Sequence, residues 1–214
     1  MKKLIYLVTV VLFCSCSVTQ YHTAKPLKKG EKQIVVGLDS YIAPTVQIIA
    51  KQGINNNFVS ALPINPNLQF NWGTKKNKDR TISLSVLGQL SYAVNYGLVN
   101  NEDIKFSMSV RPEVGLLAVP LQNQEVSYWA KTPLLFTKEF GEKSSFTFSP
   151  SLLFAYTGYK YAVSKHQNVF FSSSFAFHYG NKGRLVVGFS FINFKNNFSQ
   201  QLSIGYIFKF GSVK

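Results

Sequence analysis

The sequence KFSMSVRPEVGL, residues 105–116, alternates apolar and non-apolar side chains without a break. Successive side chains of a β-strand point to opposite faces, so this alternation predicts a strand with one apolar and one polar face. The run is long for a soluble protein, whereas strands of membrane barrels alternate over about ten residues. The apolar face holds Phe106, Met108, Val110, Pro112, Val114 and Leu116, and the other face holds Lys105, Ser107, Ser109, Arg111, Glu113 and Gly115.

Later segments repeat this alternation. Phe146, Phe148 and Phe154 form one apolar face, and Phe175 and Phe177 belong to another. The opposite faces are rich in Ser, Gly, Ala and Thr, which suits the crowded interior of a narrow barrel. A secreted β-sandwich also alternates, but its watery face would carry Lys, Glu, Thr and Gln. We therefore predict an all-β fold, an antiparallel transmembrane β-barrel, with the sandwich as the rival.

Turn residues divide the chain into about ten strands, an even number as in single-chain bacterial barrels. We expect one barrel domain at residues 33–210, with a first strand at 33–43 and a C-terminal tail at 211–214. The register around residues 44–66 and 86–90 stays open, including whether the chain reverses near Gly88. If both ends lie in the periplasm, the turns near residues 75, 101, 142 and 181 are periplasmic, and the loops near 53, 122, 162 and 196 face outward.

The N-terminus has the layout of an export sequence. Lys2 and Lys3 precede an apolar stretch that is too short to span a bilayer, which predicts a signal peptide at residues 1–15. The sequence FCSC at residues 13–16 resembles a bacterial lipobox, which implies that Cys16 is lipidated with fatty acids such as palmitate. Residues 16–32 then form a lipidated N-terminus and basic tether. A plain signal peptide that is cut nearby is the alternative, and no thiol remains for a disulfide or metal site.

The chain has a net charge of +14. Only 15% of its residues are charged, whereas it contains 19 Phe and 11 Tyr. That composition suits a lipid-facing band better than a surface in water. The basic excess favours anionic lipid headgroups and lipopolysaccharide as partners. Nucleic acid is set aside, because the aromatic residues keep the strand period instead of lying among basic residues on one soluble face.

The periplasmic strand ends are expected to carry an aromatic girdle and basic residues. Aromatic side chains collect at membrane interfaces, and basic side chains there lie near anionic headgroups. The basic residues can also be read as solvated turn charges. The girdle is predicted at Trp72, Tyr96, Phe140, Tyr179 and Phe208.

Five charged residues alternate onto the inner face, and we predict that they form a charge cluster in the lumen. Opposite charges in a narrow interior mostly pair, because unpaired charge away from water is costly. The alternative is a slim, basic, water-filled path. Large inward residues such as Trp129 and Leu135, with Leu153 and Phe170, favour a closed lumen. The predicted cluster consists of Asp39, Arg111, Glu113, Lys131 and Lys209.

Catalytic candidates are weak. Ser164 and His166 weakly resemble the His and Ser pair of lipid A deacylases, but the two residues are in reversed order and no convincing acid lies nearby. A single inward histidine such as His178 is usually a hydrogen-bonded filler. We therefore predict no enzymatic activity, no cofactor and no metal site.

The lipobox, the tether, Lys29-Gly30-Glu31 and the terminal strand with Tyr206, Phe208 and Phe210 together resemble small outer-membrane β-barrel lipoproteins of Bacteroidota. The resemblance implies an outer-membrane location and recognition of the aromatic-ended terminal strand by the barrel-assembly machinery. In that phylum, surface-exported lipoproteins carry acidic residues after the lipidated cysteine. None follows Cys16, which implies an anchor in the inner leaflet, on the periplasmic side.

The expected function is a non-enzymatic outer-membrane barrel lipoprotein with a structural or partner-docking role in the Gram-negative cell envelope. A narrow passive channel for small solutes or anions is the alternative, and a lipid-modifying enzyme is a weaker third option. The sequence names no particular envelope protein as the partner.

Overall fold

The computed structural model describes residues 21–42, 64–85, 89–119, 125–157, 166–181, 183–194 and 197–211. The predicted signal peptide, Cys16 and Ser164 lie outside these ranges. No helix of the described residues is long and apolar enough to cross a membrane. The strands are β1 (Lys32–Ile42), β2 (Ile64–Lys75), β3 (Lys78–Ser85), β4 (Gln89–Asn101), β5 (Phe106–Val110), β6 (Glu113–Val119), β7 (Glu125–Phe140), β8 (Ser144–Thr157), β9 (His166–Tyr179), β10 (Gly183–Phe194) and β11 (Asn197–Phe210).

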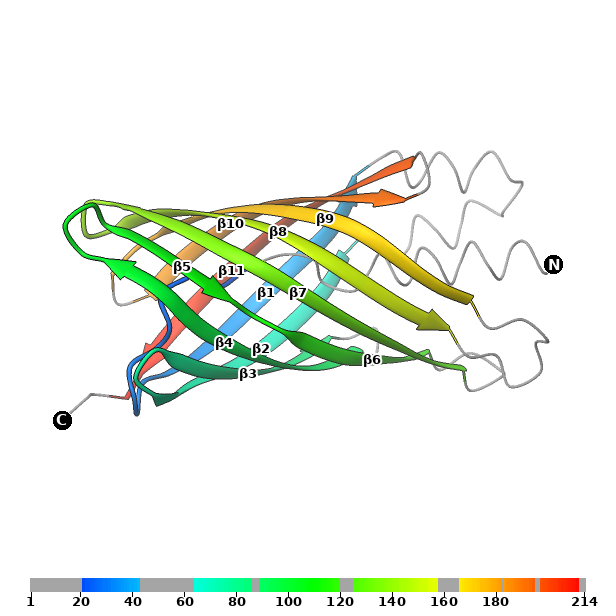
Figure 1. Ribbon diagram of the computed structural model, residues 1–214, viewed down its shortest axis with the longest axis horizontal. Helices are drawn as coiled ribbons and strands as arrows, with labels where there is room; N and C mark the ends of the chain where they lie inside the picture. The colour runs from blue at the N-terminus through cyan, green and yellow to red at the C-terminus, as the bar shows by residue number, and fades with distance from the viewer. Residues whose placement is uncertain are drawn as a thin grey trace.

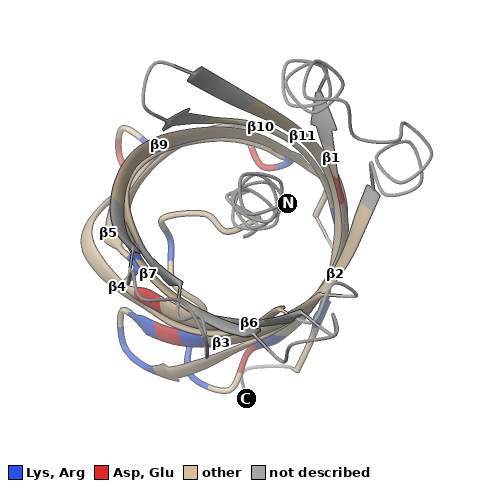
Figure 2. Cartoon of the chain, turned by 90° about the vertical axis from the view of Figure 1, so that its right-hand side faces the viewer, with Lys and Arg blue, Asp and Glu red and all other residues tan. Residues whose placement is uncertain are grey.

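The strands form one closed antiparallel barrel, which confirms the predicted fold class (Figure 1). The first strand, β1, pairs with both β2 and the last strand, β11, so the sheet has no free edge. Figure 2 shows the closed ring of strands from one end. Near Gly88 the chain forms two strands, β3 and β4, which pair with each other and settle the question that the sequence left open.

The barrel has ten strands because β5 and β6 are two parts of one of them. Both parts pair with β4 on one side and with β7 on the other. They are separated by Arg111 and Pro112. Proline has no N–H to donate to a neighbouring strand, which explains the interruption of the regular ladder there. Single backbone hydrogen bonds, Arg111 N to Pro133 O at 3.0 Å and Val94 N to Pro112 O at 3.1 Å, hold the interrupted strand in the wall.

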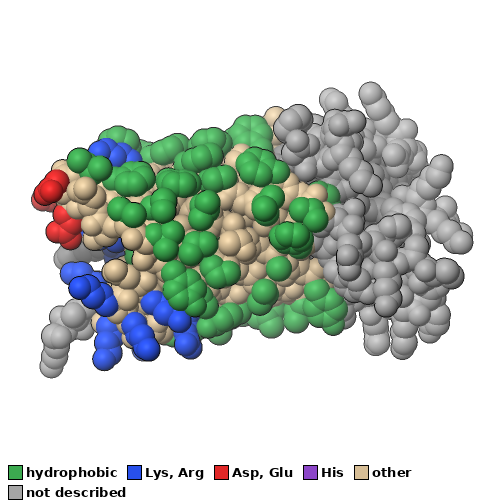
Figure 3. All heavy atoms as spheres, viewed as in Figure 1, with side chains coloured by type: hydrophobic (Ala, Val, Ile, Leu, Met, Phe, Trp, Pro, Cys, Tyr) green, Lys and Arg blue, Asp and Glu red, His purple; other side chains and the backbone are tan. Residues whose placement is uncertain are grey.

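The outside of the barrel is an apolar band (Figure 3). Large apolar side chains that alternate outward stay exposed on every part of the wall, among them Val36, Leu84 and Phe177. Phe148 stacks on Phe175 with ring centroids 5.0 Å apart. A continuous apolar exterior with a polar interior is the arrangement of a protein that spans lipid.

The turns after β2, β4, β7 and β9 lie at the end of the barrel where β1 begins and β11 ends (Figure 1). The longest connection, between β1 and β2, lies at the opposite end. Short turns face the periplasm in bacterial barrels, so we name the first end the inner rim and the other the outer mouth. This assignment agrees with the orientation that the sequence predicts.

The chain before β1 lies inside the barrel, which differs from a tether below it. Tyr21, His22 and Ala24 are buried, and the strands surround this part of the chain (Figure 2). Lys28 and Lys29 are exposed at the inner rim, next to the start of β1. We name residues 21–27 the inner segment. The sequence-based interpretation missed it, because a short segment of mixed polar and apolar residues without a period carries no face pattern.

Candidate functional site: the occupied lumen

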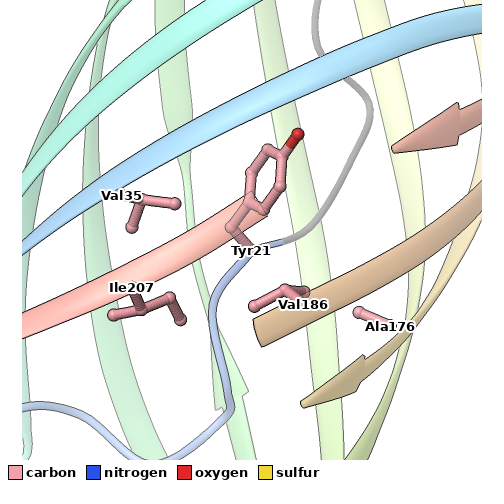
Figure 4. Close-up of a cluster of buried hydrophobic side chains, with 5 residues drawn as sticks. All are labelled: Tyr21, Val35, Ala176, Val186 and Ile207. Carbon is pink, nitrogen blue, oxygen red and sulfur yellow. The ribbon is translucent and has the colours of Figure 1, made fainter. Parts of the chain in front are cut away.

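Tyr21 anchors the inner segment in the middle of the barrel. Its side chain is fully buried and packs with Val35, Ala176, Val186 and Ile207 from four strands of the wall (Figure 4). Its hydroxyl donates a hydrogen bond of 2.6 Å to Asp39 Oδ1. An aromatic ring with a satisfied hydroxyl can be buried at this depth without leaving an unpaired polar group.

Glycines in the wall leave room for the inner segment. A Cβ on Gly37 would lie 2.5 Å from Tyr21 Oη, and a Cβ on Gly205 would lie 2.5 Å from Tyr21 Cε1. A Cβ on Gly73 would overlap the carbonyl oxygen of Lys28, and one on Gly97 would lie 3.0 Å from Pro26 Cγ. These four glycines belong to β1, β11, β2 and β4. The wall is therefore shaped to the segment along its length.

Hydrogen bonds tie the inner segment to several sides of the lumen. His22 Nε2 lies 2.9 Å from Gln69 Oε1 on β2. The backbone N–H of Ala24 donates to Thr137 Oγ1 on β7 at 2.7 Å. The backbone N–H of Leu27 donates to Asp79 Oδ2 on β3 at 2.9 Å. In a closed ring of ten strands β7 lies across from β1, so the segment bridges the lumen.

His22 adds no positive charge to the lumen at neutral pH. It belongs to the inner segment and not to a membrane strand. Burial, and second the nearby Arg111 guanidinium, hold the pKa of the imidazole well below its usual range. The tautomer of the neutral ring that carries its proton on Nε2 can donate the hydrogen bond to the Gln69 side-chain carbonyl.

Arg111, Glu113 and Lys131 form an ion-pair cluster in the wall. Glu113 Oε2 lies 3.2 Å from Arg111 Nη1 and 3.2 Å from Lys131 Nζ. Ser91 Oγ donates to Glu113 Oε1 at 2.8 Å. The three charged side chains are only 3%, 5% and 6% exposed, so water screens them poorly. Two cations share one carboxylate here, next to the interruption between β5 and β6.

Of the other two predicted lumen charges, Asp39 lies in the interior, whereas the prediction for Lys209 was wrong. Asp39 accepts hydrogen bonds from Tyr21 and from Asn67 Nδ2, the latter at 2.7 Å. Lys209 is exposed at the inner rim, where β11 ends. The structure therefore brings three of the five predicted residues into one cluster and gives Asp39 the separate task of holding Tyr21.

The polar interior continues between Tyr21 and the outer mouth. The side chains of Asn65, Ser172, Ser190 and Gln201 are buried, and none of their side-chain polar atoms has a hydrogen-bond partner among the described residues. Buried polar groups of this kind normally bind water. This part of the lumen therefore suits water, whereas the inner segment fills the part nearer the inner rim.

The residues predicted for the girdle lie on the outside at the inner rim. Tyr96, Phe140, Tyr179 and Phe208 are exposed, and Trp72 is half-buried beside them. Lys78 Nζ lies 4.7 Å from the centroid of the Tyr96 ring, a cation–π contact. The large inward residues Trp129, Leu135, Leu153 and Phe170 are buried in the interior.

The catalytic candidates gain no support from the described residues. His166 begins β9, and Ser164 is not among them. His178 is fully buried, and neither of its ring nitrogens has a hydrogen-bond partner in the part of the chain that the structure describes. Within the described ranges, no group of three His, Cys, Asp or Glu residues could hold a metal ion.

Sequence reasoning missed the residues that hold the inner segment. Tyr21 and His22 are the two aromatic rings in an otherwise polar, basic stretch, and Gly37, Gly73, Gly97 and Gly205 all alternate inward. The sequence thus contained both the aromatic residues of the inner segment and the glycines that make room for the segment. Their pairing depends on contacts far apart in the chain, which no local pattern reveals.

No protein-family model and no curated protein matches the chain. Among solved structures, Ail of Yersinia pestis in a phospholipid bilayer nanodisc has a TM-score of 0.43 at 7% identity and covers 85% of this chain and 100% of its own. Neisserial surface protein A has a TM-score of 0.40 at 10% identity, with 84% and 96% covered. The translocator domain of NalP from Neisseria meningitidis has a TM-score of 0.43 at 8% identity, with 86% and 90% covered. With TM-scores below 0.5, these similarities assign neither a family nor an activity to this chain.

Proposed function

We propose that this protein is a non-enzymatic outer-membrane barrel that is closed to ions and has a structural or partner-docking role in the envelope. One observation carries the proposal: the wall is shaped to the inner segment. Tyr21 fills the space above two glycines and is hydrogen-bonded to Asp39. A segment that merely lay in an open pore would not need glycines at its contact points. The Arg111–Glu113–Lys131 ion pairs place buried charge beside it.

Conductance tests this proposal. The purified full chain, inserted into a planar bilayer, should show no steady current. A variant that lacks residues 21–27 should conduct, because the contacts of Tyr21, His22 and Ala24 with the wall are then gone. The shift of the band between heated and unheated samples in gels shows that the variant still forms a barrel. A stable, ohmic channel from the unaltered chain would refute the closed lumen.

The second candidate is a narrow channel that opens when the inner segment leaves. It is favoured by the polar side chains between Tyr21 and the outer mouth that have no partner among the described residues, since Asn65 and Gln201 suit a water-filled vestibule. On this reading, current appears in the unaltered chain only as occasional openings, and Tyr21→Ala makes them more frequent. Rare openings from a stable closed state would support this channel, whereas a permanently closed barrel would show none.

Lipidation of Cys16 is part of the same proposal. It is supported by the resemblance of residues 13–16 to a lipobox. Metabolic labelling with a fatty acid should mark the chain, and Cys16→Ala should abolish the label. If the label persists, the anchor is not at this cysteine. If the variant becomes soluble in the periplasm, the barrel is not the main anchor, since a whole apolar band should outweigh one or two acyl chains.

The position of Tyr21 bears on which leaflet such an anchor reaches. Tyr21 lies beside Gly37, five residues from the start of β1, or about 16 Å along the strand at about 3.3 Å per residue. The chain from Cys16 to Tyr21 spans at most about 17 Å. Barrel strands tilt by about 35–45°, so the height between Tyr21 and the inner rim is smaller than this distance, and the length of the chain allows an anchor on either side. We therefore keep the inner-leaflet anchor that the sequence suggested as the proposal, with an exit at the outer mouth as the alternative.

A cysteine in place of Thr19 distinguishes the two anchors. Exit at the outer mouth predicts that a membrane-impermeant maleimide labels Thr19→Cys on intact cells. Labelling only after the outer membrane has been permeabilised would refute the outward exit and favour the periplasmic side. Either outcome is compatible with a closed lumen, because the proposal of a closed lumen rests on residues 21–27.

A further inference from the structure

Seven basic residues gather on one side of the inner rim. They come from the start of β1, the chain before it and the hairpin of β2 and β3. Lys32 pairs with Trp72, and Trp72 pairs with Arg80 on the next strand. Backbone hydrogen bonds of 3.2 Å from Gly30 N to Gly73 O and 2.9 Å from Gly73 N to Glu31 O hold the preceding chain against the hairpin. We call the group the basic rim patch: Lys28, Lys29, Lys32, Lys75, Lys76, Lys78 and Arg80.

Part of this patch faces lipid and not the aqueous lumen. Lys32 lies on the same face of its strand as the exposed Val36, and Arg80 lies on the same face of its strand as the exposed Ile82. The basic side chains therefore continue the outer rows of the wall where the apolar band ends. Trp72 lies between Lys32 and Arg80, at the depth where headgroups begin.

Glu31 is the one acid of the described residues that lies accessible within the patch, against seven basic residues. Glu31 accepts a hydrogen bond from the backbone N–H of Lys28, and Asp79 is buried, where it accepts one from Leu27. The exposed acids of the rim, Glu102, Asp103 and Glu142, belong to the turns after β4 and β7. Figure 3 shows most of the blue side chains together at this end, below the red ones. Glu31 offsets only a small part of the positive charge of the patch.

We propose that the basic rim patch binds the headgroup phosphates of anionic phospholipids in the inner leaflet of the outer membrane. The guanidinium of Arg80 offers a planar fork of donors to phosphate oxygens, and the lysines add point charges around it. Each basic residue near an anionic surface contributes about 1 kcal/mol of attraction. An acidic soluble protein fits less well, because Lys32, Lys78 and Arg80 lie in rows that continue into the apolar band.

Trp72 gives a direct measurement of this binding. The chain has two tryptophans, and the other, Trp129, is only 3% exposed in the interior. Bromine on lipid chains quenches indole fluorescence at short range. The purified full chain is reconstituted into phosphatidylcholine vesicles that contain a small fraction of dibrominated phosphatidylglycerol, or the same fraction of dibrominated phosphatidylcholine. The anionic lipid should quench Trp72 more strongly, and added salt should reduce the difference.

Two triple variants decide whether the patch is responsible. Lys32→Gln with Lys78→Gln and Arg80→Gln should lower the preference for the anionic lipid at least about tenfold, because three charges near the anionic surface are lost. The control variant, Lys105→Gln with Lys138→Gln and Lys143→Gln, removes the same charge from other exposed parts of the rim and should keep the preference. Equal quenching by both brominated lipids in the unaltered chain would overturn the proposal. So would an equal loss in both variants, which would indicate net charge alone.

Discussion

Glu113→Gln tests whether water reaches the Arg111–Glu113–Lys131 cluster. Glu113 is the shared acceptor for Arg111, Lys131 and Ser91. Glutamine keeps nearly the same shape but removes the negative charge. The change therefore leaves two buried cations without their counter-charge and disturbs little else.

The size of the loss follows from burial. Removal of one partner from a buried ion pair costs about 3–5 kcal/mol, whereas a solvated pair is worth about 0.2–1 kcal/mol. The Glu113 side chain is 5% exposed, which places this cluster at the buried end of that range. We expect the free energy of unfolding to fall by about 3 kcal/mol or more.

Unfolding by guanidinium in lipid vesicles, followed by tryptophan fluorescence, measures this loss. Lys131 Nζ lies 5.3 Å from the centroid of the Trp129 ring, so the indole reports on the cluster itself. Ser91→Ala is the matched control, since it removes one neutral donor and should cost about 0.5–1.5 kcal/mol. A loss below about 1 kcal/mol for Glu113→Gln would refute the dry cluster and favour a water-filled path.

Three further predictions concern the wall and one turn. Phe148→Arg should impair assembly by about 2–4 kcal/mol, because it places a charge against lipid. Ser149→Arg should act only through its volume in the lumen. If both variants behave identically in heat-modifiability gels, the assigned faces are wrong. Gly37→Leu should displace Tyr21 from its position and destabilise the barrel, and a stability equal to that of the unaltered chain would mean that the fit around Tyr21 is not needed. Asn77, with φ of 58°, should tolerate glycine but lose about 1–2 kcal/mol on change to valine, which an equilibrium unfolding curve measures.

The period of two in the sequence predicted the wall in detail. It assigned Phe148 and Phe175 to the outside and Ser149 and Ser174 to the inside, and the exposures agree. It also placed Arg111 and Glu113 on the same side as Lys131. Glu113 and Lys131 are direct partners across β6 and β7, so alternation and pairing order together were enough to bring the charges near each other.

The occupied lumen could not be predicted in the same way. Ala24 and Thr137 are 113 residues apart in sequence, and their hydrogen bond has no counterpart in any local pattern. The small inward residues indicated a narrow interior, which is also what an empty barrel would need. Only three-dimensional coordinates distinguish a glycine that narrows a barrel from one that makes room for a tyrosine.

The position of Tyr21 links the inner segment to closure of the barrel. Gly37 and Gly205 are direct partners across β1 and β11, the first and last strands, and so lie on the seam where the sheet closes. Opposed glycines leave a seam without side-chain contacts on that face, and an aromatic ring laid over them restores the packing. The Tyr21 ring contacts both glycines, and its hydroxyl reaches Asp39 two residues further along β1. The same side chain that occupies the lumen therefore also holds the seam, so loss of the inner segment should weaken the wall as well as open the interior.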